Sequence, residues 1–192
     1  MRVISGEKKG RKLFSPSEDT RPTEDRVKEA LFNILTDIDK ESSVLDLFAG
    51  SGGVGIEFLS RGAAAAVFSD FKRENIQIIK KNLEHVGYED RGYLYSGDFK
   101  RNLYQISQSV VSSFDYIFID PPFDKINYYE SALEQIDNLS LLKKDGIIIL
   151  ESREELNLDS EEFECIKEKK YGKRIRLYFL TRRDQDESTV SR

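Results

Sequence analysis

Apolar residues along the chain alternate between short continuous runs and segments with helical spacing. Five apolar runs have the length of strands, at residues 44–48, 65–70, 93–96, 116–119 and 147–150. The segments between them have helical spacing, at residues 54–61, at 73–86 up to Gly87, from about residue 100, and at 129–142, with Gly146 expected in the last turn. Strands that alternate with helices of this length predict a doubly wound, mostly parallel α/β sheet.

Both ends of the chain depart from this alternation. Residues 2–14 alternate loosely around two glycines, which predicts a short hairpin or an extended arm. A helix with one apolar face is expected at residues 27–38. Two late runs, 163–170 and 175–181, are joined by too few residues for a helix, so we expect an antiparallel hairpin at the sheet edge.

We therefore divide the chain into an arm with its helix at 1–40, an α/β domain at 41–183 and a polar tail at 184–192 that we expect to be disordered. No apolar run approaches the roughly 18 residues of a membrane span, and the first residues lack a signal peptide, so we expect a cytoplasmic protein. One cysteine and one histidine argue against a disulfide framework or a zinc site, so no metal is expected. We also expect a monomer.

Charge is distributed unevenly. The net charge of −5 argues against a nucleic-acid partner, yet residues 1–12 carry five basic residues against one acidic, and residues 167–183 carry eight against one. Such runs are commonly solvated faces. If they contact phosphate, the candidates are Lys8, Lys9, Arg11, Lys12, Lys173 and Arg174.

Residues 44–55 read as a strand, a glycine turn and a helix start. Gly50, Gly52 and Gly55 fit G-x-G-x-x-G, and an acidic residue ends the next strand, which alone would suggest a dinucleotide and a nicotinamide-dependent oxidoreductase. Asp46 changes this interpretation because a carboxylate would repel a pyrophosphate but attract the ammonium group of a methionine moiety. The pattern favours S-adenosylmethionine, although Asp46 could instead be a capping or turn residue.

Two further strand ends supply acidic residues for the rest of this cofactor. Asp70 can accept both ribose hydroxyls, and Asp98 can accept the adenine amino group or simply cap the helix that follows it. Phe99, which follows Asp98, can line the pocket for the adenine ring. The full candidate set is Asp46, Phe48, Gly50, Ser51, Gly52, Asp70, Phe71, Asp98 and Phe99.

The apolar run 116–119 ends in Asp120-Pro121-Pro122-Phe123. Ligands of open α/β sheets bind at the carboxyl ends of strands, so this tetrapeptide should lie beside the cofactor. Asp120 and the carbonyl of Pro121 can accept the two hydrogens of an amino group, while Phe123 stacks on a base for about 1–3 kcal/mol. Positioning then suffices, because the sulfonium is already a strong electrophile. Alternatively, the two prolines merely stiffen a loop.

At these residues the sequence resembles amino-methyltransferases with an Asn/Asp-Pro-Pro-aromatic motif, and within them the RsmD family of 16S rRNA guanine-N2 methyltransferases. The closer match includes Arg21-Pro22-Thr23 leading into the first helix. The other matching segments are 2–6, 10–13, 24–35, 44–52, 59–63 and 120–123. The resemblance covers nearly the whole chain up to residue 183.

The resemblance implies a Rossmann-like class I S-adenosylmethionine-dependent fold and methylation of one guanine of 16S rRNA within the assembling 30S subunit. It also places Arg21 and Thr23 near the active site. Two positions depart from many relatives, Gly53-Val54 for Ala-Leu and Asp70 for Glu. Two alternatives remain: a DNA adenine or protein amino-methyltransferase, although the chain has no separate target-recognition segment, and a catalytically silent RNA-binding assembly factor.

Overall fold

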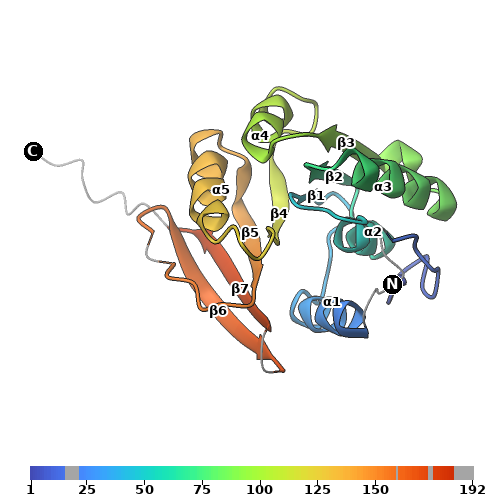
Figure 1. Cartoon of the computed structure of the whole chain (residues 1–192), viewed down its shortest axis with the longest axis horizontal. Coiled ribbons are helices and arrows are strands. Elements are labelled where there is room, and N and C mark those ends of the chain that lie inside the picture. The colour runs from blue at the N-terminus through green and yellow to red at the C-terminus, as the bar shows by residue number, and fades with distance from the viewer. Residues whose placement is uncertain (16–21, 159, 173–174, 184–192) are drawn as a thin grey trace, which may run out of the picture.

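A seven-stranded sheet forms the centre of the protein (Figure 1). The computed structural model describes residues 1–15, 22–158, 160–172 and 175–183, apart from the side chains of residues 22–24 and 26. The strand order is β3-β2-β1-β4-β5-β7-β6. The strands are β1 Ser43–Asp46, β2 Ala65–Asp70, β3 Gly92–Ser96, β4 Phe114–Ile119, β5 Leu142–Ser152, β6 Phe163–Tyr171 and β7 Ile175–Arg182. The first five are parallel and β7 is antiparallel to both of its neighbours, which confirms the predicted sheet and its terminal hairpin.

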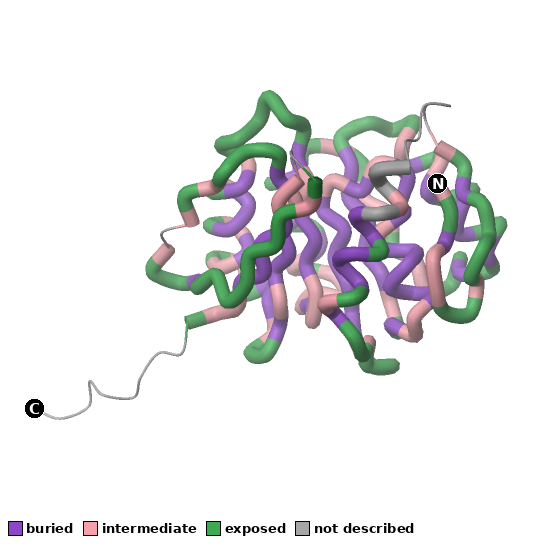
Figure 2. Tube along the Cα trace, turned by 90° about the horizontal axis from the view of Figure 1, so that it is seen from below, coloured by how far each residue is buried: buried purple, intermediate pink, exposed green. Residues whose placement is uncertain are grey.

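Helices cover both faces of this sheet. They are α1 Pro22–Ile34, α2 Gly53–Ser60, α3 Arg73–Val86, the short 3₁₀ helix Glu89–Arg91, α4 Phe99–Ser107 and α5 Asn127–Asn138. Alternate strand residues enter two cores, so Val44 packs with α1, α2 and α3 whereas Leu45 packs with α4 and α5. Figure 2 shows the buried residues concentrated along the central strands. This two-sided burial explains why the strands are continuous apolar runs.

The N-terminal arm is a hairpin, as expected. Arg2 and Lys12 form an antiparallel bridge, and the backbone N–H of Val3 donates to the carbonyl of Arg11 at 2.9 Å. Gly6 has a φ of 80°, and a Cβ there would lie 1.9 Å from the carbonyl oxygen of Ser60. Only glycine permits the arm to approach α2 this closely.

Three element boundaries differ from the sequence prediction. Helix α1 begins at Pro22 and ends at Ile34, so it both starts and ends earlier than expected, and the segment after it leads to a turn in which the Asp39 side chain accepts from the N–H of Glu41 at 2.7 Å. Helix α5 ends at Asn138, before Ser140 with a φ of 52°. Gly146 lies inside β5 rather than in a turn; a Cβ there would lie 2.9 Å from the carbonyl oxygen of Phe114, beside an irregularity in the pairing.

Candidate active site

A cavity of about 290 Å³ opens at the carboxyl ends of β1, β4 and β5. Strand order reverses between β1 and β4, which is the position where ligands bind in open α/β sheets. The residues lining the cavity include Met1, Lys28, Asp46, Phe48, Gly50, Ser51, Gly53, Phe118, Asp120 and Glu151. Four of the predicted cofactor positions and the predicted Asp120 are therefore brought together. No cluster of three metal-ligating side chains occurs in the described part of the chain.

Asp46 is the last residue of β1 and is only 1% exposed. Its Oδ2 accepts a hydrogen bond from the backbone N–H of Gly55 at 3.0 Å, which ties the strand to the first turn of α2. Burial raises the pKa of Asp46 to about 7; the Gly55 hydrogen bond opposes this, while the carboxylates of Asp120 and Asp70 add to it. A buried carboxylate of this kind is stabilised by a bound cation such as an ammonium group.

The glycine turn after β1 needs residues that tolerate left-handed backbone. Gly50 and Gly52 have φ values of 56° and 78°. A Cβ on Gly52 would also lie 3.2 Å from Ile79 and 3.3 Å from Phe68. The turn therefore lies flat on the core, with its backbone accessible from the cavity.

Asp70 ends β2 and fixes this turn from the neighbouring strand. Its Oδ2 accepts from the N–H of Gly50 at 2.8 Å, and its Oδ1 accepts from the N–H of Lys72 at 2.8 Å and from Asn75 Nδ2 at 3.0 Å. A carboxylate offers about four lone pairs. Accepting both ribose hydroxyls would therefore require Asp70 to release one of these protein donors.

Asp98 and Phe99, which follow β3 and were expected to contact the adenine, have contacts within the protein. Asp98 is exposed and caps α4, accepting from the N–H groups of Lys100 at 3.0 Å and Arg101 at 3.3 Å, so the capping alternative is present. Phe99 is 5% exposed, and its ring centre lies 5.4 Å from that of Phe48. Phe99 thus packs against Phe48, whereas Phe71 is 76% exposed.

The Asp-Pro-Pro-Phe segment leaves β4 at the cavity. Asp120 lines the cavity and Pro121 is buried. The carbonyl of Pro122 accepts from the N–H of Lys125 at 2.9 Å, closing a tight turn that projects Phe123, which is 64% exposed. The turn thus presents an aromatic ring to solvent beside a cavity that contains carboxylates.

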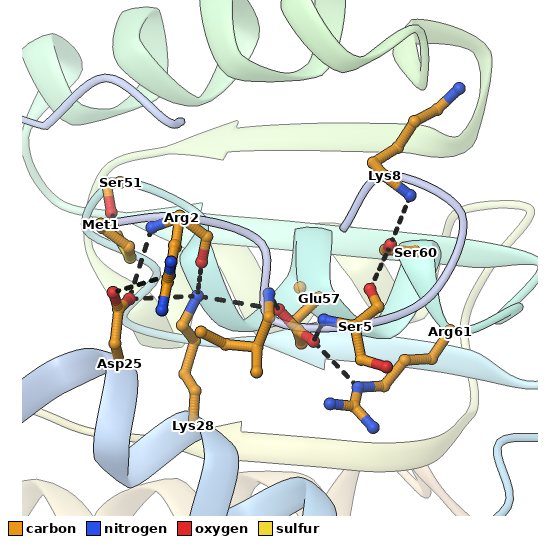
Figure 3. A network of polar contacts seen from close by, with 12 residues as sticks. Met1, Arg2, Ser5, Lys8, Asp25, Lys28, Ser51, Glu57, Ser60 and Arg61 are labelled. Atoms are coloured by element: carbon orange, nitrogen blue, oxygen red, sulfur yellow. Dashed lines mark hydrogen bonds and ion pairs between the residues drawn. The ribbon is translucent and has the colours of Figure 1, made fainter. Parts of the chain in front are cut away.

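The sequence interpretation missed the polar network that holds the arm against α2 and α1 (Figure 3). Glu57 of α2 is fully buried, and its carboxylate accepts from the N–H groups of Ile4 at 2.7 Å and Ser5 at 2.9 Å. It also pairs with Arg61 at 2.9 Å and with Lys28 at 3.8 Å. The one visible signal was a lone acidic residue in an otherwise apolar helix.

Lys28 extends this network from α1 to the arm. Its Nζ donates to the carbonyl of Arg2 at 2.6 Å. The preceding residue, Met1, lines the cavity with its Sδ 3.8 Å from Ser51 Oγ. A Cβ on Gly53 would lie 2.2 Å from that sulfur atom, so this glycine leaves room for Met1.

The predicted RNA-contacting residues fall into two groups. Lys9, Arg11 and Lys12 are exposed on the arm, whereas Lys8 is half-buried and pairs with Glu7 at 2.7 Å. The other candidates are Arg21, Lys173, Arg174 and the side chain of Thr23, which lie outside the described residues. In the part of the chain that is described, no helix is long and apolar enough to cross a membrane.

Comparison with known proteins gives consistent matches. A family profile described as Conserved hypothetical protein 95 matches residues 1–180. YlbH of Bacillus subtilis is 41% identical over 159 residues, covering 82% of this chain and 85% of that protein. Ribosomal RNA small subunit methyltransferase D of Haemophilus influenzae is 35% identical over 174 residues, covering 90% and 89%.

Solved structures agree with these matches. The structure of yhhF from Escherichia coli superposes with a TM-score of 0.80 at 30% identity, covering 95% of this chain and 97% of that one. Two methyltransferase structures with S-adenosyl-L-homocysteine bound share the fold at 14% identity.

Proposed function

The chain belongs to the family described as Conserved hypothetical protein 95, the RsmD family of rRNA methyltransferases, and from this premise we propose that it methylates the exocyclic N2 amine of a guanine in 16S rRNA. It is an S-adenosylmethionine-dependent enzyme that methylates rRNA. Our proposal adds three points: the methylated atom is guanine N2, the substrate is the assembling 30S subunit, and the residues named below bind the cofactor and the base.

The observation that carries the proposal is the cofactor site, in which the buried Asp46 carboxylate ends β1 just before the glycine turn. Its pKa, raised by burial to about 7, reflects a group that gains from a cationic partner. The ammonium of the methionine moiety supplies such a cation, and the flat turn at Gly50 and Gly52 lets the rest of the molecule approach the backbone. These residues fit S-adenosylmethionine, which when bound supplies a methyl group as an electrophile.

Asp120 and Phe123 would hold the substrate. Phe123 stacks on the guanine, and Asp120 accepts one hydrogen of the amine, so that the nitrogen lone pair is directed into the cavity. S-adenosylmethionine, when bound, would supply the methyl carbon and its sulfur would keep the electrons of the broken bond, while Asp120 or water would take the surplus proton of the amine. The base must leave its helix to reach this position.

The charges of the chain favour an assembled particle over naked RNA. The net charge of −5 disfavours general phosphate binding, and exposed cations gather at the arm, with Lys9, Arg11 and Lys12, and along β6, with Lys167, Lys169 and Lys170. We therefore expect the arm to contact the 16S backbone of assembling 30S subunits in the cytoplasm, with ribosomal proteins shaping the target.

Transfer of labelled methyl groups tests the proposal. Purified enzyme should label 30S particles from cells that lack the gene, and label naked 16S rRNA or DNA far less. Asp120→Ala should lose most of the turnover while its affinity for S-adenosylhomocysteine stays near that of the wild type, because the lost contact is with the amine. Preferential labelling of DNA would favour the DNA adenine alternative, and cofactor binding without transfer would favour a silent assembly factor.

A further inference from the structure

Arg153 follows β5 directly and lies over the exposed aromatic ring of the Asp-Pro-Pro-Phe turn. Its guanidinium carbon is 3.4 Å from the centre of the Phe123 ring. This is a stacking distance, well inside the roughly 6 Å within which a cation interacts with an aromatic face. Both side chains are exposed, and they come from the ends of two adjacent parallel strands, β4 and β5.

The loop after β5 is positioned by its own contacts. The N–H of Glu154 donates to Ser152 Oγ at 3.1 Å, which turns the chain immediately after the strand. Glu155, the acidic residue that follows, pairs with Arg176 at 2.9 Å. This pairing directs the carboxylate of Glu155 to the hairpin.

An aromatic ring has two faces, and Arg153 covers one face of Phe123. A base can therefore stack only on the opposite face. A guanidinium that stacks through its plane keeps its N–H groups at its edge, where they can donate to a phosphate. Lysine has no such plane, so it cannot supply both functions.

We propose that Arg153 is a substrate-positioning residue, which holds the Phe123 ring ready for the target base and binds a backbone phosphate beside the extruded nucleotide. This inference rests on the proposed function, since it assigns Phe123 to base stacking. Arg153 would thus join the proposed RNA-contacting residues, although it lies outside both basic stretches of the sequence and follows β5 close to the Asp-Pro-Pro-Phe turn. The enzyme thereby gains a phosphate contact close to the reacting base.

A competing arrangement makes the opposite prediction. If Arg153 occupied the place of the target base in the free enzyme, its removal would free that site and lower KM for the particle. If it positions Phe123 and a phosphate, its removal raises KM. The sign of the change in KM therefore decides between the two.

The test uses full-length Arg153→Ala and Arg153→Lys, with Lys144→Ala as a control for an exposed cation near the other end of β5. Initial rates of methyl transfer to 30S particles are measured between 50 and 200 mM salt, conditions over which a phosphate contact is visible. Arg153→Ala should raise KM by about fivefold and reduce the log-log salt slope by about 0.7, the value for one single-strand phosphate. Arg153→Lys should recover the slope but only part of KM.

All three variants should retain wild-type affinity for S-adenosylhomocysteine and wild-type melting temperature, and Lys144→Ala should also retain KM and slope. An unchanged or lowered KM in Arg153→Ala would overturn the inference. A wild-type enzyme that does not methylate the particles would instead refute the proposed function, so the two failures are distinguishable.

Discussion

Replacing Asp46 with asparagine separates two effects of its charge, one on cofactor affinity and one on the stability of the cofactor-free protein. The carboxyl is buried, and burial raises its pKa from 3.8 to about 7. Asparagine keeps an oxygen that can accept from the N–H of Gly55, now 3.0 Å from Oδ2, but it carries no charge. We expect Asp46→Asn to stabilise the cofactor-free protein while it weakens cofactor binding.

The sign and size of the effect follow from the shifted pKa. Between about pH 4 and pH 7 the folded state holds a proton on Asp46 that the unfolded state has lost, so wild-type stability falls as the pH rises through this window. Each pH unit is worth about 1.4 kcal/mol, which sets an upper limit of about 4 kcal/mol above pH 7. The gain from Asp46→Asn should therefore be larger at pH 8 than at pH 5, by up to about 2–3 kcal/mol.

Denaturant unfolding at the two pH values, with and without S-adenosylhomocysteine, measures both effects. The variant should lose about 1–3 kcal/mol of ligand affinity, and wild-type affinity should weaken below pH 7 because a protonated carboxyl cannot pair with an ammonium. Asp115→Asn is the opposite control. Burial opposes the shift there, but hydrogen bonds from Lys143 and Ser43 lower the pKa of Asp115 overall, so asparagine should destabilise at pH 8. A cofactor-free Asp46→Asn less stable than wild type at pH 8 would refute the reasoning.

Three further changes test the rest of the site. Asp70→Ala should weaken S-adenosylhomocysteine binding by about 1–3 kcal/mol in calorimetry, because it would remove the proposed ribose acceptor and also removes the partner of the glycine turn; unchanged affinity would contradict this. Glu57→Gln should lower the free energy of unfolding by about 3–5 kcal/mol, since two cations lose their buried partner, and a melting curve identical to wild type would exclude its anchoring role. Alanine at Lys9, Arg11 and Lys12 together should raise KM for 30S particles and flatten the salt dependence by about 0.7–0.9 per phosphate, with cofactor affinity unchanged; wild-type kinetics and slope would mean that the arm is only a solvated surface.

Most of the fold could be predicted because burial on both faces produces uninterrupted apolar strands. The errors lie where a local turn competes with a periodic pattern. The first helix ends at Ile34, short of the expected Ile38, and Ser140 with positive φ follows the end of α5 before β5 pairs with β4. Gly146 was assigned to a turn because glycine usually marks one, but here it permits a close backbone approach within a strand.

Which residues line the cavity could be predicted where a residue lies at the carboxyl end of a strand. Asp46 and Asp120 line the cavity, as expected from their positions at the end of β1 and directly after β4. The anchoring role of Glu57 could not be predicted, because it bonds to backbone N–H groups 52 and 53 residues away that carry no signature of their own. The contact of Arg153 with Phe123 could not be predicted either, because the two residues follow different strands and are far apart in the sequence.

The most direct test of the account is the identity of the methylated nucleoside. Small subunits from cells that lack the gene are incubated with the enzyme and S-adenosylmethionine, and their 16S rRNA is digested and analysed by mass spectrometry. The account predicts one new N2-methylguanosine per particle with wild-type enzyme and almost none with Asp120→Ala. A methyl group on another base or another atom, or no new methylated nucleoside, would contradict it.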